Sequence, residues 1–135
     1  MNRLLKIILA LAILIIVPKM IQKMMFKSPQ EKALAAVRAS VQEVSRTLPK
    51  KIDSVTTVTK TELSGSTYKI YYTMDPSVQL DRSRKSAAEQ TAKQEICGSS
   101  KRMLTDNGIT VEYVYTFAGS GDERLSVVVP SGSCT

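Results

Sequence analysis

The first 26 residues constrain this chain more than any other stretch. Two basic residues, Arg3 and Lys6, precede an unbroken apolar run from Ile7 to Val17, and this is the form of a secretory targeting segment. Pro18-Lys19-Met20-Ile21 follow the run in place of a small-x-small cleavage site. No cysteine lies near its end to accept a lipid. We therefore interpret residues 1–27 as an uncleaved signal anchor.

The length of the apolar run leaves three arrangements open. Ile7–Val17 alone covers roughly 17 Å of a hydrocarbon core about 30 Å thick. A helix through residues 4–26 is long enough to span it, with Lys19 and Lys23 reaching the headgroups near one end. Alternatively, the chain bends near Pro18 and its second half lies in the interface as an amphipathic helix. The third arrangement is a cleaved signal peptide.

Two features of the sequence disagree about which side of the membrane carries the rest of the chain. Basic residues are more numerous after the apolar run than before it, which favours a cytoplasmic C-terminal side. Cys97 and Cys134 are the only cysteines, and such a pair in a small exported domain predicts one disulfide, which persists in oxidising compartments. We expect a single-pass protein of the inner membrane whose C-terminal domain lies in the periplasm.

Composition removes several classes of function. The net charge is +7, but residues 1–27 hold five of the nineteen basic side chains and no acid, so residues 28–135 carry only +2. No nucleic-acid partner is therefore expected. The chain has no histidine, and it has no glycine-rich phosphate loop, nucleophile elbow or acid cluster at metal spacing. We expect no enzyme activity, cofactor, metal or small-molecule substrate.

Residues 28–135 have the length of one small domain. Ser28-Pro29-Gln30-Glu31 combines an N-cap serine, a proline at the first helical position and a glutamate three residues after the cap, so it predicts the start of a helix. An apolar stripe with 3-4 spacing follows. Its members are Leu34, Val37, Val41, Val44 and Leu48.

Alternating and Val/Thr-rich segments predict four strands. Residues 52–63 and 67–74 are joined by the turn Ser64-Gly65-Ser66, and residues 109–117 and 125–129 by a turn at 119–122. A helix over residues 81–106 separates the pairs and should direct apolar side chains inward: Ala88, Ala92, Ile96, Cys97, Met103 and Leu104. The expected fold is α+β, an α-β-β-α-β-β domain with an antiparallel sheet carrying its helices on one face.

The tyrosines of the strands fall into two groups by parity. Tyr113, Tyr115 and Phe117 should be buried beneath the helices. Tyr71 has the opposite parity from its neighbours Tyr68, Ile70 and Tyr72, so we expect it on the outer face. Because tyrosine is enriched at interfaces, Tyr71 is the candidate partner surface, and sheet-face packing is the alternative explanation for these residues.

The layout over Gln30–Cys134 resembles a known family. A helix, paired strands, a helix containing Ile96-Cys97 and Met103-Leu104, a VxYxYxF strand and the terminal Cys134 are similar to the α/β class of type II secretion pilotins. That resemblance implies a chaperone of secretin subunits, although a lipid-acceptor cysteine is missing after the apolar run. Similar anchored domains of unknown function match as well.

We therefore expect a membrane-anchored periplasmic protein that acts by protein binding, as an accessory or assembly factor of an envelope or secretion apparatus. The alternative is an immunity or inhibitor protein against a toxin or hydrolase at the membrane.

Overall fold

A computed structural model of the chain describes residues 28–134. Its first helix, α2 (Pro29–Ser45), begins as the sequence predicts, because the Ser28 hydroxyl accepts a hydrogen bond from the Glu31 amide at 3.2 Å. The predicted membrane anchor lies outside the described residues. Among the helices of residues 28–134, none is long and apolar enough to cross a membrane.

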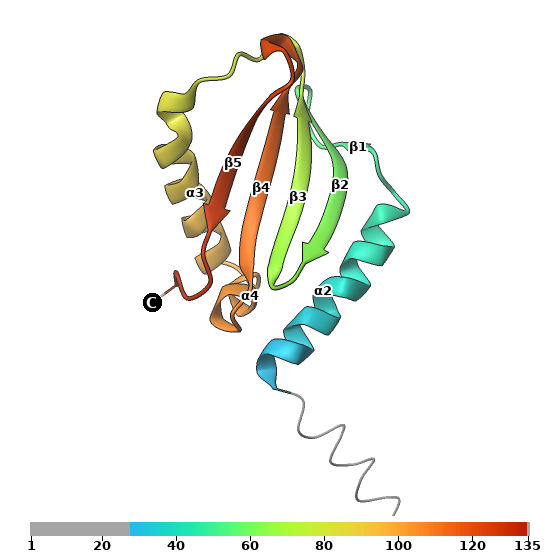
Figure 1. The fold of residues 1–135 in the computed structure, drawn as a ribbon, viewed down its shortest axis with the longest axis vertical. Coiled ribbons are helices and arrows are strands. Elements are labelled where there is room, and N and C mark those ends of the chain that lie inside the picture. The colour runs from blue at the N-terminus through green and yellow to red at the C-terminus, as the bar shows by residue number, and fades with distance from the viewer. Residues whose placement is uncertain (1–27, 135) are drawn as a thin grey trace, which may run out of the picture.

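Five strands form one sheet in the order β1-β2-β3-β4-β5 (Figure 1). Their bounds are Lys50–Lys51 (β1), Thr56–Ser64 (β2), Thr67–Met74 (β3), Thr110–Phe117 (β4) and Glu123–Val129 (β5). The predicted turn between β2 and β3 is confirmed, and Gly65 adopts the left-handed conformation there, with φ of +59°. The short β1 was not predicted; it pairs only with Thr57 and Val58 of β2.

The sheet is mixed, so the prediction of a wholly antiparallel sheet was wrong. β3 and β4 run parallel, with Thr67 opposite Thr110 and Met74 opposite Phe117. The chain leaves β3 at one end of the sheet and travels back along one face through helices before entering β4, and such a crossover returns the chain in the same direction. Residue alternation sets which side chains share a face but does not set strand direction.

The segment predicted as one helix over residues 81–106 is divided into three. A 3₁₀ turn (Arg82–Arg84) leads into α3 (Lys85–Cys97), and a short α4 (Arg102–Asp106) follows. The break lies at Gly98-Ser99-Ser100, where the Ser99 hydroxyl accepts the Lys101 amide at 3.2 Å. Because the axis changes there, Met103 is 47% exposed, in contrast to its predicted inward position.

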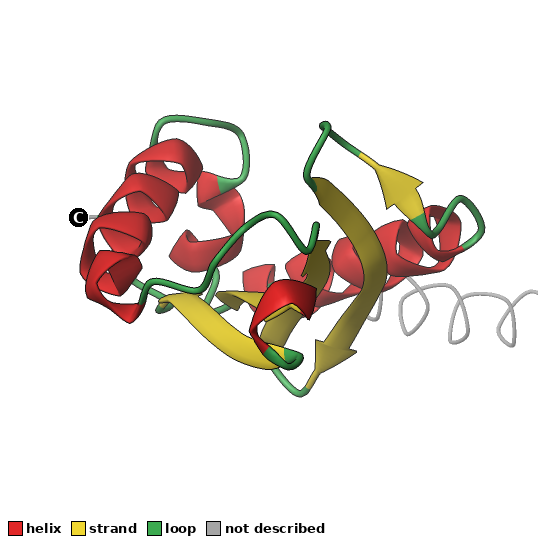
Figure 2. Cartoon of the chain, turned by 90° about the horizontal axis from the view of Figure 1, so that it is seen from above, coloured by secondary structure: helices red, strands yellow, loops and turns green. Residues whose placement is uncertain are grey.

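Helices α2 and α3 pack on the same face of the sheet but near opposite edges, as seen from above in Figure 2. Beneath α3 lies a cluster centred on the fully buried Ile96, here called the α3 cluster: Ile96, Val111, Tyr113, Val127, Val129 and Cys134. Beneath α2 lies a smaller one, the α2 cluster: Ala33, Val37 and Ile109. The predicted disulfide is present between Cys97 and Cys134, whose Cα atoms lie 5.3 Å apart, and it joins the end of α3 to the segment after β5.

Candidate binding groove

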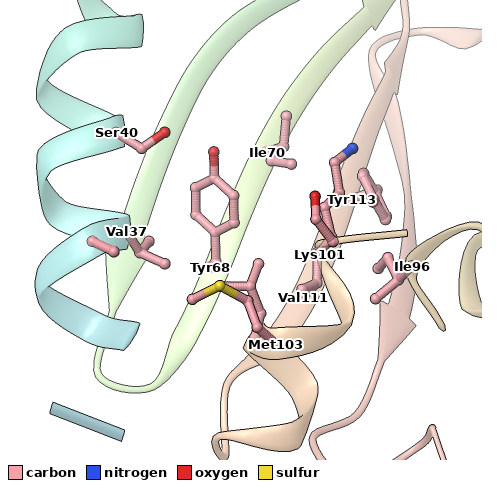
Figure 3. Close-up of a pocket in the computed structure, with 12 residues that line it drawn as sticks. Val37, Ser40, Tyr68, Ile70, Ile96, Lys101, Met103, Val111 and Tyr113 are labelled. Atoms are coloured by element: carbon pink, nitrogen blue, oxygen red, sulfur yellow. The ribbon is translucent and has the colours of Figure 1, made fainter. Parts of the chain in front are cut away.

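The spacing between α2 and the α3–α4 segment leaves an open hollow of about 360 Å³ above the sheet. We call it the α4 hollow. Val37 and Ser40 of α2 form one side, Tyr68 and Ile70 of β3 the floor, and Met103 of α4 part of the other side. Figure 3 shows Tyr68 standing between the α2 side chains on one side and Lys101 on the other, with Met103 nearby.

A second, adjoining hollow of about 570 Å³ continues along the same face. We call it the tyrosine hollow, because Tyr72, Tyr113 and Tyr115 line it from the sheet. Helix α3 contributes Ala88, Ala92 and Glu95, and the segment before β2 contributes Asp53. The two hollows share Ile70, Lys101 and Tyr113, so they adjoin one another between the helices, and together we call them the groove.

The three tyrosine rings form a compact aromatic group. The rings of Tyr72 and Tyr115 are stacked, with centroids 4.9 Å apart and planes inclined by 15°, while Tyr72 and Tyr113 lie 6.1 Å apart. Burial, together with the nearby Glu95 carboxylate, raises the pKa of Tyr113 to about 12. The same two causes raise the pKa of Tyr115. These phenols are therefore neutral in the physiological range and suit contact better than proton transfer.

Charged side chains are placed at different points of the groove. Lys101 borders both hollows, whereas Asp53 and Glu95 border only the tyrosine hollow. The pKa of Asp53 is lowered, chiefly because its carboxylate accepts the Val55 amide at 2.8 Å. Asp53 is therefore anionic at neutral pH.

Tyr71 lies on the other side of the sheet from this groove. Its hydroxyl donates to a Glu62 carboxylate oxygen at 2.9 Å, and the Lys60 ammonium lies 5.5 Å from its ring centroid. Lys69 and Glu112 form a further ion pair at 3.8 Å on the neighbouring strands. The predicted parity of Tyr71 is confirmed, but its role as a partner surface stays a prediction.

Sequence reasoning missed the groove. The available signal was chemical: four inward strand positions, Tyr68, Tyr72, Tyr113 and Tyr115, carry a phenol. A hydroxyl on the core face of a strand needs water or a polar partner, and this indicates a face that is not fully covered. Within residues 28–134, no group of three His, Cys, Asp or Glu side chains is placed to hold a metal ion.

Comparisons with known proteins define the class of fold. The chain is similar to a candidate secreted protein from Pseudomonas aeruginosa, with a TM-score of 0.65 at 14% identity over 81% of this chain and 98% of that one. It is also similar to EpsS, the pilotin of the Vibrio vulnificus type 2 secretion system, with a TM-score of 0.61 at 13% identity over 79% of this chain and 96% of EpsS. The resemblance to pilotin domains that the sequence indicated is therefore confirmed at the level of the fold. No family model matches the sequence, and neither does any curated protein.

Proposed function

We propose that this protein is a non-catalytic accessory or assembly factor of a bacterial envelope or secretion apparatus, and that it binds a segment of a partner protein in the groove. The observation that carries the proposal is the open groove with its aromatic floor, on a domain that shares its fold with a secretion pilotin. The fold likeness alone would not carry it, because one fold hosts many functions.

The groove has the chemical character of a peptide-binding site. Its floor consists of large side chains from β3 and β4, and two helices form its walls. Apolar grooves with a few polar groups are where amphipathic segments dock, and exposed aromatic and methionine side chains are favoured contacts. Met103 is one such exposed side chain, at the edge of the α4 hollow.

The proposal also includes the site of action. Residues 4–26 would anchor the protein in the inner membrane, and the domain that follows would lie in the periplasm. The disulfide between Cys97 and Cys134 supports this placement, since disulfides persist in oxidising compartments. An alkaline-phosphatase reporter fused after Thr135 tests it and should be active. Activity of a cytoplasmic reporter at the same position would reverse the orientation.

Site-specific photo-crosslinking in cells tests the binding role. A benzophenone amino acid replaces Met103 at the groove in one strain and Tyr71 on the outer face in a second. We expect the Met103 probe to give a covalent protein adduct that the Tyr71 probe does not give. Mass spectrometry of the adduct then separates an apparatus component from a toxin or hydrolase, which would favour an immunity role.

Two outcomes would count against the groove. An adduct from Tyr71 alone would move the partner surface to the outer face. If neither the Met103 probe nor the Tyr71 probe gives an adduct, the result would contradict protein binding by this domain.

A further inference from the structure

We propose that the tyrosine hollow receives a basic side chain, arginine or lysine, from the partner segment that occupies the groove. This inference rests on the proposed function above, because it names the chemistry of the segment. The α4 hollow would hold apolar side chains of the same segment. The partner would thus carry apolar residues at one end of its binding stretch and a cation at the other.

The first argument is the geometry of the aromatic group. Tyr72, Tyr113 and Tyr115 come from two adjacent strands and line the hollow side by side. The negative face of such a ring attracts a cation within about 6 Å of its centroid. A guanidinium also packs flat on aromatic rings, so the ring faces that are not used in the Tyr72–Tyr115 stack would be its contact surface.

The second argument is the set of acceptors around that platform. Glu95 of α3 and Asp53 on the segment before β2 both border the hollow. Glu95 is exposed, and its side chain lines the same hollow as Tyr72, Tyr113 and Tyr115. The three phenols line the same hollow as the two carboxylates, so an incoming donor would meet both kinds of acceptor there.

The third argument is the distribution of charge along the groove. The tyrosine hollow has two carboxylates and one ammonium, that of Lys101, on its border, whereas the α4 hollow has the ammonium alone. Charge complementarity therefore places the cation of the occupant at the tyrosine end and disfavours an acidic side chain there. A purely apolar occupant would cover the carboxylates and phenols without replacing the hydrogen bonds that these groups make to water.

Binding of small analogues to the full-length protein tests the site directly. The protein, labelled with ¹³C at tyrosine rings, is held in dodecyl maltoside; a phosphocholine detergent is avoided because its own cation would compete. N-acetyl-arginine amide is the probe, and N-acetyl-citrulline amide is the uncharged control of the same shape. We expect the arginine probe to shift the ring signals of Tyr72, Tyr113 and Tyr115, with millimolar affinity, and citrulline to bind several-fold more weakly.

A matched pair of variants on α3 assigns the effect to the carboxylate. Glu95→Gln removes the charge at the hollow, whereas Glu89→Gln removes a charge that pairs with Lys85 at 3.9 Å and does not border the hollow. We expect Glu95→Gln to raise the dissociation constant on the order of fivefold, as the loss of one rim charge would, and Glu89→Gln to leave it unchanged. Both are surface changes that should not alter the melting temperature.

Equal affinity for arginine and citrulline, or equal effects of the two variants, would overturn the inference. The crosslinking experiment at Met103 keeps this failure distinct from a failure of the proposed function. If the Met103 adduct forms equally well in the Glu95→Gln variant, the groove binds a protein but the proposed cation site is wrong. If the arginine probe binds but no adduct forms, the cation site stands and the proposed protein partner is wrong.

Discussion

The two walls of the groove are held to the sheet in different ways. The α3 wall rests on Ile96, which is 0% exposed, and the disulfide ties its last residue to Cys134. The Arg102 guanidinium, just beyond it, donates to the Cys134 carbonyl at 2.6 Å. The α2 wall rests on three small or medium buried side chains and on partly buried ones packed against them, with one long hydrogen bond of 3.5 Å from Gln30 to the Gly108 carbonyl.

This difference indicates a groove with one fixed and one adjustable wall. Proteins open locally with free energies that depend on the buried contacts of each segment. The α2 helix packs on the smaller buried cluster and, unlike α3, has no disulfide to the rest of the domain, so it should separate from the sheet at a lower free energy than α3. The tyrosine hollow, which borders α3, is then pre-formed, while the α4 hollow, which borders α2, can adapt its width to the partner.

Removal of the disulfide should have the largest effect on stability. It should also reduce the difference between the α3 wall and the α2 wall more than any other change. In the chain-entropy model, closing a loop of about 38 residues is worth roughly 4 kcal/mol, an upper guide because strain and residual structure subtract. We expect the Cys97→Ser/Cys134→Ser variant to lose up to about this much free energy of unfolding in urea titrations. Hydrogen exchange in α3 should then approach that in α2. An unchanged urea midpoint would contradict the fixed-wall interpretation.

Truncation of Ile96 tests the packing beneath α3 with the disulfide intact. Ile96→Ala should lower the free energy of unfolding by about 3 kcal/mol, since a fully buried aliphatic side chain leaves a cavity when it is shortened. Lys93→Ala, at an exposed position of the same helix, is the control and should change stability by less than about 0.5 kcal/mol. Alanine favours a helix at least as well as lysine or isoleucine, so similar losses from both variants would mean that the burial of Ile96 is not what holds α3 to the sheet.

Truncation of Val37 tests the other wall. Val37 is 5% exposed in the α2 cluster, and Val37→Ala removes two methylene equivalents, worth about 1.5 kcal/mol in all. Because α2 is expected to open separately, hydrogen exchange should rise in α2 and much less in α3. A rise of the same size in both helices would show that the domain opens as one unit, and the adjustable-wall interpretation would fail.

The features that the sequence predicted are those set by local chemistry. Ser28 and Pro29 begin a helix wherever they occur in that pattern, and the alternation of Tyr113, Tyr115 and Phe117 correctly assigns their shared face. The pairing of Cys97 with Cys134 followed from a count of two. Each of these features can be predicted from a few neighbouring residues or from the number of residues of one type.

The features that were missed depend on how segments meet in space. The parallel pairing of β3 with β4 depends on the path of the crossover, which no pattern within either strand records. The break at Gly98 divides a segment that the sequence predicts as one helix, and its consequence for Met103 depends on the new axis of α4. The groove itself arises because α2 and α3 are spaced apart on the sheet, and this spacing is a property of the packed domain.

A substitution on the outer face of the sheet should have the smallest effect on stability. It tests the sheet alone, because it leaves both walls of the groove unchanged. Tyr71 belongs to β3, the central strand, and its hydroxyl bonds to the partly exposed Glu62 carboxylate. Since partly exposed polar pairs at a sheet surface contribute little to stability, Tyr71→Ala should change the free energy of unfolding by no more than about 0.5 kcal/mol. Hydrogen exchange in α2 and α3 should stay at wild-type values.

Tyr68→Ala is the matched variant from the same strand, on the opposite face. Tyr68 packs against the α2 cluster, so its loss should accelerate exchange in α2 and lower the melting temperature. If Tyr71→Ala melts as early as Tyr68→Ala, the outer face supports the fold more than its exposure indicates. If instead Tyr71→Ala melts normally but abolishes the crosslink at Met103, the partner contacts both faces of β3 and the groove accounts for only part of its binding.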